Sequence, residues 1–161
     1  MIKGLHHNAY RCKNSEETRK FYEDFLGLPL AIAFPIEETK TNRKTSALHT
    51  FYELDDGSYL AFFEVPDMSF DFIQQHDYDL HIALEVEMDD MLAMHAKGKA
   101  AGIETRGVAD HGFIKSIYFR DPNGYVIELT AKIKDQTLPA GEARIKAKEA
   151  LKEWIEDQSA N

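Results

Sequence analysis

Short stretches of alternating or continuous apolar residues recur along this chain, and such stretches are typical of β-strands. In the first half they cover residues 3–12, 28–34, 47–54 and 58–65. Between the first two, four apolar side chains recur at helical spacing: Phe21, Tyr22, Phe25 and Leu26. The first half therefore predicts a strand, a helix and three further strands.

Capping and turn residues support these boundaries. Asn14, followed three positions later by Glu17, has the form of a capping box, which marks the start of a helix. Gly27 is a typical C-terminal stop for that helix. The sequence DDG at residues 55–57 predicts a hairpin turn, and the polar residues 37–44 predict a loop or an edge hairpin.

The second half repeats the same order of elements. We expect a strand at 80–87, a helix at about 88–101 ended by Gly102, and strands at 103–108, 115–120 and 125–131, the last two joined by a turn at 121–124. An internal repeat of this kind decides the fold more strongly than local propensity does. The predicted fold is α+β, with paired βαβββ modules at about 3–65 and 79–131 that form a cup-shaped mixed sheet within a domain spanning 1–135.

The composition changes near the C-terminus. Residues 139–158 are rich in Lys, Glu and Ala, and they carry a partial apolar stripe that includes Ile145, Leu151, Trp154 and Ile155. This pattern predicts a surface helix with one buried side, docked against the domain or against a partner subunit.

The composition excludes several classes of function. The chain has 161 residues, of which 43% are hydrophobic and 29% charged, as in a globular domain. A net charge of −9 disfavours nucleic acid and anionic membrane surfaces as partners. No apolar run has the roughly 20 residues of a membrane helix, and the single cysteine, Cys12, cannot form an internal disulfide. We therefore expect a cytoplasmic protein.

Two residues with metal-binding side chains leave the apolar faces of their strands. In the strand that begins the second module, Ile82 and Leu84 share one face and His81 points to the other. In the last strand, Ile127 lies on one face and Glu128 on the other. Imidazole nitrogen and carboxylate oxygen suit Fe(II), Mn(II), Co(II), Ni(II) or Zn(II). The pattern suggests a divalent metal site on the concave side of the sheet.

Three segments of the chain resemble the vicinal oxygen chelate superfamily, which includes glyoxalase I, bleomycin and fosfomycin resistance proteins and extradiol dioxygenases. Residues 7–9 with 21–28 resemble the opening of its first module, residues 81–86 the start of its second, and residues 116–128 its closing hairpin. The resemblance covers residues 4–131. It implies the paired-module fold, a homodimer and a small-molecule substrate.

The resemblance also implies roles for single residues. His7, His81 and Glu128 match the metal ligands, and Glu64 matches the extra ligand of glyoxalase I and methylmalonyl-CoA epimerase. In an isomerase of that kind, Glu64 or Glu128 would act as the catalytic base. Arg11 matches a substrate-binding arginine of glyoxalase I. Two further residues match catalytic groups of extradiol dioxygenases: Tyr118, which would hydrogen-bond the substrate, and His111, which would act as an acid or base.

Three functions remain open on this basis. The favoured hypothesis is an Fe(II) extradiol-type dioxygenase acting on a catechol-like molecule. The second is a glyoxalase I-like lyase or isomerase that works through a metal-bound enediolate. The third is a ligand-binding protein of the bleomycin-resistance type. Coordination of the metal by Glu64 would distinguish the second from the first.

Overall fold

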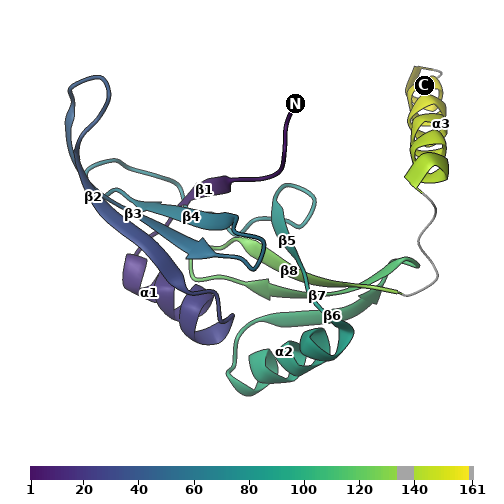
Figure 1. Cartoon of the computed structure of the whole chain (residues 1–161), viewed down its shortest axis with the longest axis horizontal. Helices are drawn as coiled ribbons and strands as arrows, with labels where there is room; N and C mark the ends of the chain where they lie inside the picture. The colour runs from purple at the N-terminus through teal and green to yellow at the C-terminus, as the bar shows by residue number, and fades with distance from the viewer. Residues whose placement is uncertain (134–139, 160–161) are drawn as a thin grey trace.

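A computed structural model describes residues 1–133 and 140–159 of the chain. Its first half contains β1 (His7–Arg11), α1 (Ser15–Arg19), the π-helix η1 (Lys20–Phe25), β2 (Leu30–Glu38), β3 (Lys44–Glu53) and β4 (Tyr59–Glu64). Its second half contains β5 (His81–Glu85), α2 (Met88–Ala100), β6 (Thr105–Asp110), β7 (Ile114–Arg120) and β8 (Val126–Lys132), followed by α3 (Ala140–Ser159) (Figure 1).

The strands form two sheets of four, with the orders β1-β4-β3-β2 and β5-β8-β7-β6. In each sheet the first strand of the module pairs in parallel with the last, and the remaining pairs are antiparallel. The two modules therefore have the same topology, and the predicted paired βαβββ architecture is confirmed. The strands do not form one continuous sheet, because each module has its own four-stranded mixed sheet.

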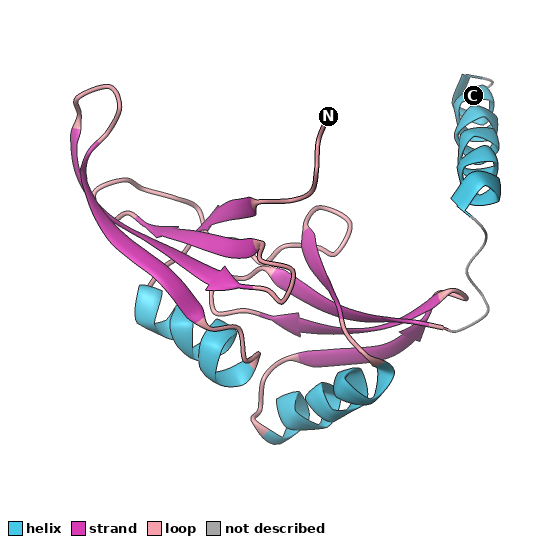
Figure 2. Ribbon diagram, viewed as in Figure 1, coloured by secondary structure: helices cyan, strands magenta, loops and turns pink. Residues whose placement is uncertain are grey.

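The helical segment α1–η1 and helix α2 lie on the same side of the two sheets, so each sheet has a helix-covered face and an open face (Figure 2). The core fills the space between helices and sheets; its fully buried side chains include Tyr22, Leu60, Phe62, Met91 and Ile127. Burial of such side chains is the main stabilising contribution to the fold. The open faces are where side chains of alternate strand positions meet solvent.

Polar contacts also join the two modules. The turn between β7 and β8 is buried: Asp121 accepts a hydrogen bond from the Tyr22 hydroxyl at 3.0 Å, and Asn123 accepts one from the Lys13 backbone at 2.8 Å. The Tyr125 hydroxyl donates to the carbonyl of Arg11 at 2.8 Å. Because buried polar groups need partners, this turn holds the second module against β1 and the first helix.

The sequence-based boundaries agree closely with the elements of the structure. The Asn14 side chain accepts hydrogen bonds from the backbone N–H groups of Glu16 and Glu17, so it caps α1 as predicted. Gly27 and Gly102 follow the helices with positive φ values of 87° and 69°, which glycine adopts without steric cost. The expected domain end at residue 135 lies outside the described residues.

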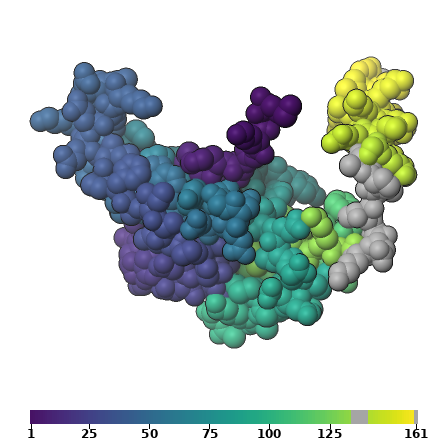
Figure 3. Space-filling model, viewed as in Figure 1, coloured from purple at the N-terminus to yellow at the C-terminus, as the bar shows by residue number. Residues whose placement is uncertain are grey.

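Helix α3 is not docked on the sheets of its own chain, and its docking against a partner subunit stays a prediction. It forms as expected, but its apolar side chains are not docked: Ile145, Leu151, Trp154 and Ile155 are each at least half exposed. Figure 3 shows the helix standing apart from the two sheets. No helix among the described residues is long and apolar enough to cross a membrane.

Candidate metal centre

The second sheet brings His81 and Glu128 together on its open face. β5 and β8 pair in parallel with Ala83 opposite Glu128, so His81 lies two positions before that pair, on the same face. His81 Nε2 is 3.2 Å from Glu128 Oε2. The Glu128 side chain is only 8% exposed, whereas that of His81 is 42% exposed. The pair is therefore accessible from the imidazole side.

The orientation of the His81 ring is set by a backbone contact. Its Nδ1 lies 2.6 Å from the carbonyl oxygen of Asp77. A carbonyl can only accept a hydrogen bond, so Nδ1 carries a proton and Nε2 is the ring nitrogen that faces Glu128. The 3.2 Å separation of His81 Nε2 and Glu128 Oε2 allows both atoms to coordinate one metal ion. The donor set and its geometry thus fit a metal ion.

Arg106 holds the loop that supplies this carbonyl. Its guanidinium donates to both carboxylate oxygens of Asp77, at 2.9 and 2.7 Å, and its Cζ atom lies 5.3 Å from the centroid of the Tyr118 ring. The hydrogen bond from Arg106 lowers the pKa of Asp77. Sequence analysis missed both residues. Asp77 acts on His81 through its backbone, and a backbone contact leaves no signal in the choice of side chain.

Tyr118 and His111 form a second pair beside Glu128. In the register of β7 and β8, Tyr118 lies directly opposite Glu128. The Tyr118 hydroxyl is 3.0 Å from His111 Nε2. Burial, and then the negative charge of Glu128, raise the pKa of Tyr118, so its hydroxyl keeps its proton at neutral pH. The structure therefore places the two expected catalytic side chains in contact with each other and next to the carboxylate.

These residues line a cavity of about 610 Å³. Its walls are formed by Asp77, Tyr78, His81, His111, Phe113, Ile114, Tyr118 and Glu128. Its size suits a small-molecule ligand. Sequence analysis did not assign four of these wall residues to the site. Asp77 and Tyr78 precede β5, Phe113 precedes β7, and Ile114 is the first residue of β7. The position of Phe113 directly after Gly112, in a polar loop, could have indicated that this side chain belongs to the site.

His7 lies on the open face of the first sheet, among aromatic side chains. Its ring is 5.4 Å from that of Phe51 and 6.5 Å from that of His49, and its Nδ1 is 2.7 Å from His6 Nδ1. His49 is buried, its Nδ1 donates to the Phe62 carbonyl at 2.9 Å, and burial lowers its pKa. His49 is therefore held as a buried, hydrogen-bonded residue of the first sheet.

The expected ligands do not all meet within one chain. Among residues 1–133 and 140–159, no three His, Cys, Asp or Glu side chains lie close enough to hold a metal ion. His81 and Glu128 are together, and His7 is on the other sheet. The assignment of His7, His81, Glu128 and Glu64 to one metal site therefore stays a prediction.

Glu64 lies on the opposite face of the first sheet from His7. It follows Leu60 and Phe62 on the helix-covered face, and its Oε2 accepts a hydrogen bond from the Ser15 backbone at 2.6 Å, at the start of α1. The strand register explains the discrepancy. His7 pairs with Tyr59, so the counterpart of Glu128 in the first module is Ala61. This geometry does not favour Glu64 as a fourth ligand or as a base at the metal.

Arg11 is engaged away from the cavity. Its guanidinium donates to the carbonyls of Val65 and Met68, at 3.0 and 2.7 Å, and lies 5.2 Å from the centroid of the Phe70 ring. These contacts hold the chain after β4 against β1. The structure therefore gives Arg11 a structural position, and substrate binding by this residue stays a prediction.

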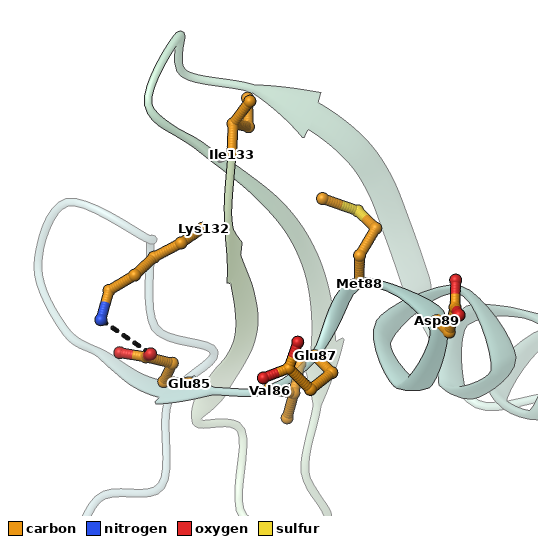
Figure 4. A pocket seen from close by; sticks show the side chains of 7 residues that line it. All are labelled: Glu85, Val86, Glu87, Met88, Asp89, Lys132 and Ile133. Atoms are coloured by element: carbon orange, nitrogen blue, oxygen red, sulfur yellow. Dashed lines mark hydrogen bonds and ion pairs between the residues drawn. The ribbon is translucent and has the colours of Figure 1, made fainter. Parts of the chain in front are cut away.

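Another hollow lies at the opposite end of β5 and β8 (Figure 4). It is lined by Glu85, Val86, Glu87, Met88, Asp89, Lys132 and Ile133. Lys132 forms an ion pair with Glu85 at 2.7 Å. The hollow shares no residue with the cavity at His81, so the candidate centre lies at one end of the second sheet only.

Comparisons with known proteins agree with this architecture. The chain is 30% identical over 135 residues to the metallothiol transferase FosB of Shouchella clausii (strain KSM-K16), and the match covers 80% of each chain. Its fold resembles a mutant of the fosfomycin resistance protein FosX from Listeria monocytogenes, solved with Mn(II) and 1S,2S-dihydroxypropylphosphonic acid, with a TM-score of 0.62, 24% identity, and coverage of 86% of this chain and 100% of that one.

A glyoxylase/bleomycin resistance protein/dioxygenase domain from Frankia sp. EAN1pec has a similar fold, with a TM-score of 0.65 and 17% identity, and the match covers 83% of this chain and 100% of that one. The sequence profile that matches residues 4–129 describes one superfamily and spans both modules. The chain therefore belongs to the Glyoxalase/Bleomycin resistance protein/Dioxygenase superfamily.

Proposed function

We propose that this protein is a metal-dependent enzyme that transfers a thiol to a small electrophile, with His7, His81 and Glu128 as the ligands of a divalent metal ion. The observation that carries the proposal is the pair of atoms, His81 Nε2 and Glu128 Oε2, 3.2 Å apart at the wall of a cavity. The identity of 30% to a metallothiol transferase favours thiol transfer among the reactions of the superfamily.

The third ligand, in this proposal, comes from a second copy of the chain. His7 and the pair of His81 and Glu128 are all on open faces, but on different sheets. A twofold dimer that packs the first sheet of one protomer over the second sheet of the other brings His7 of the partner subunit to the pair. The same packing covers exposed apolar side chains of the strands, such as Ile32, Phe34 and Val108.

The metal ion, when bound, supplies a Lewis acid that polarises a substrate oxygen. The reaction then forms a bond from the thiol sulfur to a substrate carbon, breaks the bond from that carbon to oxygen, and delivers the thiol proton to the oxygen. Tyr118 is placed to donate a hydrogen bond to that oxygen, because its hydroxyl is protonated and lies beside Glu128. His111 contacts the hydroxyl and can relay the proton.

A second candidate is the Fe(II) extradiol dioxygenase. Ala61 occupies the position at which a fourth ligand would lie, and a set of two histidines and one carboxylate leaves open positions, as in non-haem iron oxygenases. The contact between His111 and Tyr118 also fits acid–base chemistry on a bound catechol. The glyoxalase-like isomerase is less favoured, because Glu64 faces α1.

Metal analysis after anaerobic purification, followed by two assays, tests the proposal. We expect one divalent metal ion per chain, loss of free thiol when an epoxide and a thiol such as cysteine are added, and no oxygen uptake with catechols. Oxygen uptake with a catechol would support the dioxygenase instead. A protein that binds a small molecule but consumes neither thiol nor oxygen would be the ligand-binding type.

A matched pair of variants assigns the site. Glu128→Gln removes the carboxylate ligand, and we expect it to abolish metal binding. Glu85→Gln makes the same chemical change on the same face of the second sheet, where the carboxylate pairs with Lys132. We expect it to leave the metal content unchanged. Equal metal content in the two variants would refute the site.

A further inference from the structure

We infer that the cavity beside His81 takes an uncharged substrate with an aromatic or apolar body, and that it discriminates against anions such as phosphonic acids. This inference rests on the proposed function and names the substrate class of the same site. Two observations support it. The cavity has apolar and aromatic side chains in its wall, and none of its lining residues is Lys or Arg.

The ionic side chains of the cavity wall are acidic. Asp77 and Glu128 line the cavity, and none of the lining residues is Lys or Arg. Glu128 is nearly buried, so its charge acts at short range through a medium of low dielectric constant. Arg106 compensates the charge of Asp77, so Glu128 is the source of the repulsion on an anionic substrate, and no cationic side chain of the cavity wall offsets it.

The cations of the second sheet are already paired. Its strands carry four Lys and Arg residues, and each forms an ion pair with a carboxylate: Arg106 with Asp77, Lys115 with Asp110, Arg120 with Glu104, and Lys132 with Glu85. Release of any of them to hold an anionic group would leave an acidic partner behind. Recognition of phosphonate normally uses unpaired Arg or Lys donors, and this sheet offers none.

The remaining walls are apolar and aromatic. Phe113, from the loop between β6 and β7, is 53% exposed, and Tyr78, from the loop before β5, is 94% exposed. The two residues come from different loops and both line the same cavity, together with Ile114 and Tyr118. Large apolar side chains exposed around a concave site are typical of ligand-binding surfaces. A flat aromatic group can pack between them.

The opposing surface in the proposed dimer has the same character. Around His7, the open face of the first sheet presents Phe34, Phe51 and Phe63, whose rings pack with His49. A substrate between the two faces would therefore meet aromatic rings on both sides. The net charge of −9 also disfavours approach of an anion from solution.

Direct binding of two diols tests the inference without relying on turnover. The probes are 1-phenyl-1,2-ethanediol, which is neutral and aromatic, and 1,2-dihydroxypropylphosphonic acid, which is anionic. Each is titrated by calorimetry into the full chain loaded with Mn(II), after the metal content has been measured. We expect the phenyl diol to bind about ten-fold more tightly, a difference of about 1.4 kcal/mol.

The same titration on the metal-free Glu128→Gln variant separates the contribution of the cavity walls to binding from that of the metal ion. We expect its preference for the phenyl diol to persist. Phe113→Ala should weaken binding of the phenyl diol about five-fold and leave binding of the phosphonic acid unchanged. Leu92→Ala, which removes a 47% exposed side chain on α2, is the matched control and should change neither.

Two results would overturn the inference. One is tighter binding of the phosphonic acid to a chain that does hold metal; the proposed enzyme would then stand, with a different substrate class. The other is failure of the phenyl diol to bind in either form of the protein. Failure of the proposed function has a different signature, namely a wild-type chain that takes up no metal.

Discussion

The proposed sharing of the metal site between two protomers can be tested by mixing two inactive variants. His7→Ala removes the ligand on the first sheet, and Glu128→Gln removes a ligand on the second. The proposed site takes His81 and Glu128 from the second sheet and His7 from the first sheet, so each variant alone would have an incomplete site. We expect both pure variants to bind little metal.

The mixed dimer has a different composition of sites. If each site combines the first sheet of one protomer with the second sheet of the other, the heterodimer has one site with both substitutions and one site with neither. Random pairing makes about half of the dimers heterodimers, and each of them has one intact site of two. The mixture should therefore regain about one quarter of the wild-type metal content per chain.

Co-expression of the two variants, isolation of the dimer by size-exclusion chromatography and elemental analysis give the required number. The control mixes His81→Ala with Glu128→Gln, which remove two ligands from the same sheet. Every pairing of those two chains leaves both sites damaged, so this mixture should stay without metal. Thiol-transfer activity should follow the metal content in both mixtures.

Three outcomes would contradict the reasoning. No recovery in the first mixture would mean that the site is not shared in this way. Recovery in the control mixture would mean that His81 and Glu128 do not belong to one site, despite their 3.2 Å separation. Full metal content in pure His7→Ala would remove His7 from the ligand set.

Four further predictions concern single residues. Glu64→Ala should lower the free energy of unfolding by about 1 kcal/mol, because the carboxylate accepts a hydrogen bond from the Ser15 N–H at the start of α1. The same variant should keep its metal content, and loss of metal would restore Glu64 as a ligand. Tyr22→Phe should lower the free energy of unfolding in urea by about 1–3 kcal/mol, because the buried Asp121 carboxylate loses the hydrogen bond from the Tyr22 hydroxyl. A change below the error of the measurement would show that this contact between the modules is dispensable. Tyr118→Phe should slow thiol transfer about ten-fold or more without loss of metal, and an unchanged rate would exclude its hydroxyl from the reaction. The hydrogen bonds from Arg19 are the main cause of the lowered pKa values of Glu16 and Asp24. Carboxylates with lowered folded-state pKa values stabilise the fold above their ordinary values of 3.8 to 4.5, and this contribution is lost as the pH falls through the lowered values. The difference in urea midpoint between wild type and Arg19→Met should therefore shrink in acid, and a difference that is constant with pH would contradict this assignment.

The sequence by itself determined the elements, their order and the faces of several side chains. Alternation along β5 and β8 predicts that His81 and Glu128 leave the apolar faces, and the structure places them together. Asn14 and Gly27 mark the ends of the first helical segment, and both have the predicted roles. These features depend on neighbours within a few positions, so local periodicity and capping preferences are sufficient to predict them.

Tertiary structure alone decided the relations between segments that are far apart in the chain. Strand register makes Ala61, and not Glu64, the counterpart of Glu128, and a shift of three positions also moves a side chain to the other face. The separation of His7 from His81, and the exposed position of Trp154 on α3, follow from how whole modules pack. Register and module packing are set by contacts between distant segments, so the hydrophobic pattern of a single segment does not predict them.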